Sequence, residues 1–291
     1  MFIETGESGI EPQFALPPHC PLIAIGDRSG VLASHADAVV FDVKAANKML
    51  QSICLNPAAA QVVVELLRML QHLPFEAGLV AESIAYGLLQ GSSEHHAWLS
   101  KRPTQHIDPM PGAIQIARDG DCMHILLDRQ DRDNAIDRTM RDQLAEAFQL
   151  AALDNTITKV RLGAAGRSFS LGAELAEFGT TRDPALAHQI RQSTLPAIWA
   201  LRCAKKLETH VQGACIGAGL EIAAFSRRLT ASPRAWFQLP ELQMGLLPGA
   251  GGCVSLTRRV GRQRTAELIL SAKRLSAQEA LDWGLIDEIV D

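Results

Sequence analysis

Two glutamates in the C-terminal half of the chain stand in sequence surroundings that suggest acid–base chemistry. Glu221 follows the small residues 217–219 at the start of an apolar stretch, and Glu241 comes shortly before the glycine-rich loop 245–252. Burying a carboxylate on an apolar helix is unfavourable unless it has a partner or a chemical role. Glycine-rich turns expose backbone N–H groups that can bind an anion formed during a reaction. The two glutamates therefore suggest a proton-transferring pair beside an anion-binding turn.

The elements that must position this pair begin with a predicted hairpin. Residues 113–117 and 123–127 have the apolar composition of strands, and the turn between them contains Gly120. Apolar residues at helical spacing over 140–151 predict an amphipathic helix after the hairpin. This order of elements opens the second part of the chain.

Two strand, loop and helix units follow. The predicted strand 159–163 leads into a loop rich in glycine and serine at 166–172, and the predicted strand 207–211 leads through 213–219 into a helix over about 220–226. In α/β folds, a glycine loop between a strand and a helix commonly forms a ligand site. The sequence therefore predicts an α/β fold in which two such loops converge on one crevice.

The N-terminal region has its own pattern. Short apolar runs at 22–27 and 38–43 predict strands, and apolar residues at helical spacing over 62–70 and 77–90 predict two helices. Two amphipathic helices and two short strands make a poor core alone, so their apolar faces should pack on something larger.

A predicted linker separates the two parts. Residues 99–112 interrupt the periodicity and contain several prolines. We place the boundary near residue 108, which divides the chain into an N-terminal extension (1–107) and a catalytic domain (108–291).

Composition excludes several classes of protein. The 291 residues are 47% hydrophobic and 21% charged, with a formal charge of −4 and one tyrosine, which favours a globular protein that acts on a small molecule and not on nucleic acid. Six cysteines without CxxC spacing predict reduced, buried thiols, with neither a metal site nor a disulfide framework. The N-terminus lacks the pattern of a secretory leader, and no run of about eighteen apolar residues occurs. We therefore expect a cytoplasmic protein with no membrane partner.

Five stretches also carry a family resemblance, in family order and at family spacing. They are residues 168–175 (SFSLGAEL), 211–221 (VQGACIGAGLE), 237–241 (FQLPE), 245–252 (GLLPGAGG) and 280–287 (ALDWGLID). From about residue 114 to 291 the chain thereby resembles the crotonase (enoyl-CoA hydratase/isomerase) superfamily. Each motif is weak alone, whereas the set is specific. The resemblance implies a crotonase-like spiral of ββα units with flanking helices, preceded here by an α+β extension.

The resemblance also implies how the substrate is bound. Family members stabilise the enolate of an acyl-CoA thioester with two backbone N–H groups, which fall on Ala173 and Ala218 in this sequence. The family usually has glycine at the second position. A helix N-terminus, where Ala218 lies, favours negative charge. The neighbouring residues implied to contact the substrate are Ser170, Leu171, Gly172, Gly217, Pro248 and Gly249.

In hydratases of the superfamily, two carboxylates hold a water and transfer protons at the α and β carbons, and these positions coincide with Glu221 and Glu241. Family members with other activities generally lack one of the two, so the pair favours an enoyl-CoA hydratase. An isomerase, another acyl-CoA lyase or hydrolase, and a non-catalytic scaffold with this fold remain alternatives. Coenzyme A is then part of the substrate, with no separate cofactor. The usual family assembly is a homotrimer or a dimer of trimers.

Two further groups of residues are implied to contact coenzyme A. Asp131, Arg132 and Asp133 follow Gln130, where the family often has proline. Trp98 and Lys101 belong to N-terminal helices that resemble a capping segment. In other family members that segment follows the part of the chain that corresponds to residues 114–291. One hypothesis is that this segment has been relocated, as in a circular permutant. The alternative is an unrelated N-terminal interaction domain attached to a truncated core.

Overall fold

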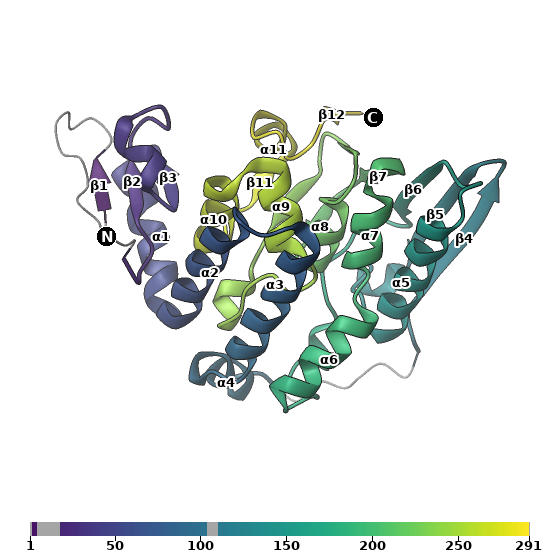
Figure 1. Ribbon diagram of the computed structural model, residues 1–291, viewed down its shortest axis with the longest axis horizontal. Coiled ribbons are helices and arrows are strands. Elements are labelled where there is room, and N and C mark those ends of the chain that lie inside the picture. The colour runs from purple at the N-terminus through teal and green to yellow at the C-terminus, as the bar shows by residue number, and fades with distance from the viewer. Residues whose placement is uncertain (1, 5–17, 104–109, 291) are drawn as a thin grey trace.

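The computed structural model describes residues 2–4, 18–103 and 110–290 and contains a six-stranded sheet (Figure 1). The strand order is β12, β9, β7, β6, β5, β4. All neighbours are parallel except β4 and β5, which form the predicted antiparallel hairpin. Side chains along β5 alternate between buried and partly exposed. The bounds are β4 Ala113–Asp119, β5 Cys122–Asp128, β6 Lys159–Ala164, β7 Leu207–Val211, β9 Arg228–Ala231 and β12 Glu288–Ile289.

A second, smaller sheet carries one of the two predicted glycine loops. It has the order β11 (Leu275–Ser276), β10 (Trp236–Gln238), β8 (Ala214–Ile216). An isolated bridge between Ser170 and Cys215 joins β8 to the loop after β6. The two glycine loops therefore lie side by side, and the predicted α/β class is confirmed.

Helices cover these sheets. The predicted helix after the hairpin is α5, which begins where the Asp137 carboxylate accepts a hydrogen bond from Met140 N (2.9 Å). The helix predicted over 220–226 instead begins at Ala218 and ends at Ala223, because Gly217 turns the chain into it with φ 48°. The bounds are α5 Arg138–Leu153, α6 Pro184–Thr194, α7 Ala197–Cys203, α8 Ala218–Ala223, α9 Gly252–Val260, α10 Arg262–Ser271 and α11 Ala277–Asp282.

The N-terminal region forms a three-stranded parallel sheet followed by four helices among its described residues. The predicted strands at 22–27 and 38–43 and helices over 62–70 and 77–90 are confirmed. Helix α3 packs against α6 and α9, and α2 contacts α9 and α10, so the apolar helix faces do pack on the core (Figure 1). The bounds are β1 Phe2–Glu4, β2 Ile23–Ile25, β3 Ala38–Val40, α1 Val43–Leu55, α2 Pro57–Leu70, α3 Phe75–Gln90 and α4 Ser93–Ser100.

Three other predictions concern the linker, the cysteines and membrane-spanning helices. The predicted linker 99–112 overlaps the end of α4, and the boundary near residue 108 lies outside the described residues. The prediction that the thiols are buried is wrong for Cys20 and Cys54, which are exposed. Among the described helices no single one is long and apolar enough to cross a membrane; α1 and α2 pass that test only together, as a pair bent by 109°.

Candidate active site

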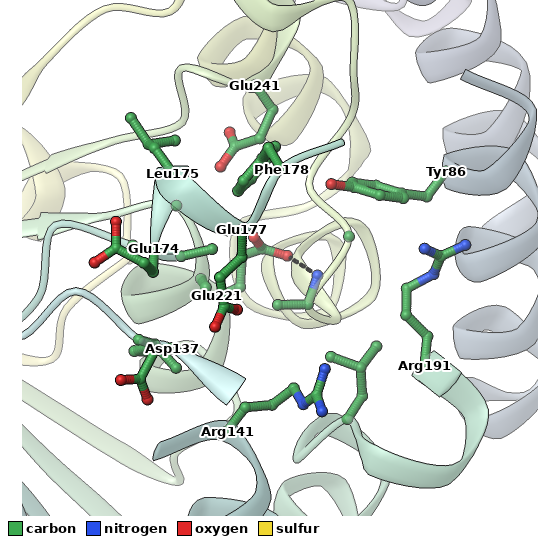
Figure 2. Close-up of a pocket in the computed structure, with 18 of the residues that line it drawn as sticks. Tyr86, Asp137, Arg141, Glu174, Leu175, Glu177, Phe178, Arg191, Glu221 and Glu241 are labelled. Carbon is green, nitrogen blue, oxygen red and sulfur yellow. Dashed lines mark hydrogen bonds between the residues drawn. The ribbon is translucent and has the colours of Figure 1, made fainter. Parts of the chain in front are cut away.

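Glu221 is buried on α8 and is held by two backbone N–H groups. Only 2% of its surface is exposed. Its Oε2 accepts hydrogen bonds from Ala250 N (2.6 Å) and Gly252 N (2.8 Å), the first of which is drawn in Figure 2. Burial raises the Glu221 pKa to about 7, against the opposing effect of the two amides. Glu221 can therefore gain or lose a proton near neutral pH.

Glu241 begins the 3₁₀ helix Glu241–Met244 and lines the same pocket. Its Oε1 lies 2.7 Å from the position of a Cβ on Gly217, so a side chain there would displace this carboxyl group. Its Oε2 is buried and has no hydrogen-bond partner among the described residues. Burial, and then the charge of Glu221, raises the pKa of Glu241 well above its usual range. The raised pKa favours the protonated form of Glu241.

Ala173 and Ala218 both line this pocket, and their loops are in contact. A Cβ on Gly172 would lie 3.5 Å from Ala218 N. Ala218 is the first residue of α8, so its N–H has no acceptor within the helix. For neither alanine does the described part of the chain provide a hydrogen-bond acceptor to its N–H. Both N–H groups therefore lie at the pocket without a protein acceptor among the described residues, and their binding of a substrate oxygen stays a prediction.

The pocket takes part of its wall from the N-terminal helices. Tyr86 and Gln90 of α3 line it, and Figure 2 shows the Tyr86 side chain reaching from α3 toward the pocket. Arg191 of α6 lies under the Tyr86 ring, with Cζ 4.7 Å from the ring centroid, and its Nη1 donates to Gln90 Oε1 (2.7 Å). A side chain on Gly249 would overlap the Tyr86 ring. The loop after Glu241 is therefore shaped to receive α3.

A third buried carboxyl group, Glu82 of α3, lies behind the pocket. It is 2% exposed and accepts hydrogen bonds from three backbone N–H groups at the start of α9. Burial, and then the charge of Glu221, raises the Glu82 pKa, while the three amides oppose this rise.

Glu82, Tyr86 and Arg191 were not predicted as site residues from the sequence. A signal for Glu82 was present, because it is the one acidic residue in the apolar stretch 77–90. Glu221 stands in a similar apolar stretch. Tyr86 and Arg191 had no such signal, because their role depends on the packing of α3 against α6.

The structure divides the predicted substrate contacts into two sets. Leu171, Gly172, Gly217 and Gly249 line the pocket. Ser170 and Pro248 are not among the lining residues; the Ser170 hydroxyl donates to Asn134 O (2.7 Å) and supports the loop from behind.

The predicted coenzyme A contacts lie outside the pocket lining. The carboxylate of Asp133, in the stretch 131–133, pairs with an arginine in the loop after β6. Trp98 packs against Phe178 with ring centroids 5.9 Å apart, and Lys101 is an exposed residue at the end of α4. Coenzyme A binding by these residues stays a prediction.

Comparison with known proteins identifies the family of the core. Residues 118–291 match the family model described as enoyl-CoA hydratase/isomerase. The 2,3-dehydroadipyl-CoA hydratase of Escherichia coli is 31% identical over 176 residues, 60% of this chain and 68% of that protein. The mevalonyl-coenzyme A hydratase SIDH of Beauveria bassiana is 32% identical over 178 residues, 57% of this chain and 62% of that protein.

Solved structures agree with this match. An enoyl-CoA hydratase from Thermoplasma volcanium aligns with TM-score 0.55 and 35% identity over 61% of this chain and 71% of its own. An enoyl-CoA hydratase/isomerase from Mycobacterium paratuberculosis aligns with TM-score 0.57 and 27% identity over 63% and 75%. The predicted crotonase-like fold is confirmed.

Proposed function

The chain belongs to the enoyl-CoA hydratase/isomerase family, and on this premise we propose that it hydrates the 2,3 double bond of enoyl-CoA thioesters. One observation carries the proposal: the two pocket glutamates lie in opposite surroundings. Glu221 accepts two amide hydrogen bonds, whereas Glu241 has a buried oxygen without a partner among the described residues. Two carboxyl groups with separated pKa values are a common arrangement for a base and an acid.

In the proposed reaction Glu221 acts as the base and Glu241 as the acid. The Glu221 carboxylate takes a proton from water, whose oxygen forms the bond to the β carbon. The double-bond electrons move toward the thioester, and the resulting enolate oxygen is bound by the N–H groups of Ala173 and Ala218; loss of one such donor typically lowers the rate about 10²- to 10³-fold. Glu241 then donates its proton to the α carbon. Coenzyme A takes part only as a portion of the substrate.

Crotonyl-CoA provides the test. The wild-type protein should hydrate it, which is followed by loss of the enoyl thioester absorbance. Glu241→Gln removes the proton donor, so we expect hydration to be nearly abolished while calorimetry still detects binding of butyryl-CoA. Near-normal turnover by this variant would contradict the proposal.

The same assays separate the alternatives. Conversion of a 3-enoyl-CoA to its 2-enoyl isomer without hydration would identify an isomerase. Binding of acyl-CoA with no turnover of either substrate would identify a non-catalytic family member.

We also propose that the N-terminal helices take the place of the capping segment of other family members. Two observations support this. Helix α3 supplies Tyr86 and Gln90 to the pocket, and the E. coli relative has about a third of its length outside the matched region, since 68% is covered. A relocated segment should occupy the position that the family's own segment occupies.

A further inference from the structure

The turn formed by residues 250–254 divides its backbone N–H groups between two buried carboxylates. Residues 250 and 252 donate to Glu221, whereas residues 251, 253 and 254 donate to Glu82. Because these groups belong to one short turn, a shift of either carboxylate disturbs the turn that holds the other. Glu221 Oε2 accepts from Ala250 N (2.6 Å) and Gly252 N (2.8 Å). Glu82 Oε1 accepts from Gly251 N (2.7 Å), and Glu82 Oε2 accepts from Cys253 N (2.8 Å) and Val254 N (3.3 Å).

Glu82 is itself held firmly by the packing of α3. The next residue, Ser83, connects α3 to α6: its hydroxyl pairs with His188 Nδ1 (2.9 Å) and accepts a hydrogen bond from Arg191 Nε (3.0 Å). Ser83, like Glu82, is 2% exposed. The carboxylate behind the turn therefore belongs to a packed helix, which gives it little freedom to move.

We propose that Glu82 is a positioning residue for Glu221: it holds the turn 250–254 from behind, so that the turn's other N–H groups orient the Glu221 carboxylate toward the substrate. This inference rests on the proposed hydration, in which Glu221 is the base. Glu82 does not line the pocket, so it acts through the turn and not on the substrate. A misplacement of about 1 Å in a reacting group can lower the rate roughly 10²-fold.

Glu82 also affects Glu241 electrostatically. Burial contributes most to the raised pKa of Glu241, and the ionised forms of Glu221 and then Glu82 raise it further. A neutral residue at position 82 should therefore lower the Glu241 pKa, so that Glu241 loses its proton at lower pH. The other titratable or charged groups near Glu82 are Glu221 on α8, Arg191 on α6, Cys253 on α9 and, one turn along α3, Tyr86.

The test compares Glu82→Gln with a matched control, Glu94→Gln, in the full-length chain. Glu94 also accepts backbone hydrogen bonds at a helix start, from Ala58 N (2.8 Å) and Ala59 N (2.9 Å) of α2, but it does not line the pocket. For Glu82→Gln we expect kcat for crotonyl-CoA to fall about 10²-fold with a smaller change in KM. The alkaline limb of its pH–rate profile should move to lower pH. Glu94→Gln should leave kcat and that limb unchanged.

Two further measurements cover the cases in which the wild-type protein does not hydrate crotonyl-CoA or Glu82→Gln does not fold. Hydrogen exchange of residues 250–254 should be faster in Glu82→Gln but not in Glu94→Gln, and this measurement needs no turnover, so it stands even if the wild-type protein does not hydrate crotonyl-CoA. Glu82→Asp keeps the charge and should retain more activity than Glu82→Gln; it also replaces that variant if the latter does not fold. Unchanged exchange in 250–254 together with wild-type kcat, or an equal loss in Glu94→Gln, would overturn the inference.

Discussion

The catalytic core and the N-terminal helices contribute different things to one pocket. The core supplies the groups proposed to react, Glu221 and Glu241, and the free N–H groups beside them. The helices supply groups that hold or enclose these, namely Glu82 behind the turn 250–254 and Tyr86 in the wall. The family match begins at residue 118 and so covers only the first set. The groups proposed to react and the groups that enclose them thus come from different regions of the chain.

The largest effect is expected when the N-terminal region is removed. A protein that lacks residues 1–105 exposes the faces of α6, α9 and α10 that α2 and α3 cover, so we expect aggregation and no measurable hydration. Light scattering, circular dichroism and crotonyl-CoA turnover check this. Attaching residues 18–103 after Asp291 through a long glycine–serine linker should restore both solubility and activity. A soluble, fully active core alone would show that the helices are dispensable.

The second test examines the core. Because the Glu221 pKa is raised to about 7 and the base must be ionised, lowering the pH through 7 protonates it. We expect kcat/KM to fall about tenfold per pH unit on the acid side. A profile measured from pH 5 to 9 with crotonyl-CoA checks this. A constant rate between pH 5 and 8 would exclude Glu221 as the base.

The smallest expected effect concerns the contact between the two regions. Gly249→Ala forces a methyl group against the Tyr86 ring, and such overpacking typically costs about 1–3 kcal/mol of unfolding free energy. Thermal or urea unfolding measures it. Tyr86→Leu in the same chain should relieve the overlap, so that the double variant is more stable than the sum of the two single effects. Strict additivity would mean that Gly249 and Tyr86 do not meet.

The reactive glutamates could be predicted from the sequence because their signals are local. Glu221 follows its own glycine turn, and Glu241 lies close to the loop 245–252. The helices over 62–70 and 77–90 were predictable for a similar reason, since helical periodicity is a property of neighbouring residues. The start of α8 was not, because it depends on the positive φ that Gly217 adopts in the folded chain.

By itself, the sequence indicated the helices over 62–70, 77–90 and 140–151, the hairpin before the last of these, and which residues carry groups able to transfer protons. Tertiary structure alone decided the state of those groups. The hydrogen bond between Gly251 and Glu82 joins residues 169 positions apart, and no local pattern specifies such a pair. The pKa of Glu221 depends on burial and on two backbone hydrogen bonds, and the pKa of Glu241 depends on burial and on neighbouring charges. All of these exist only after the chain has folded.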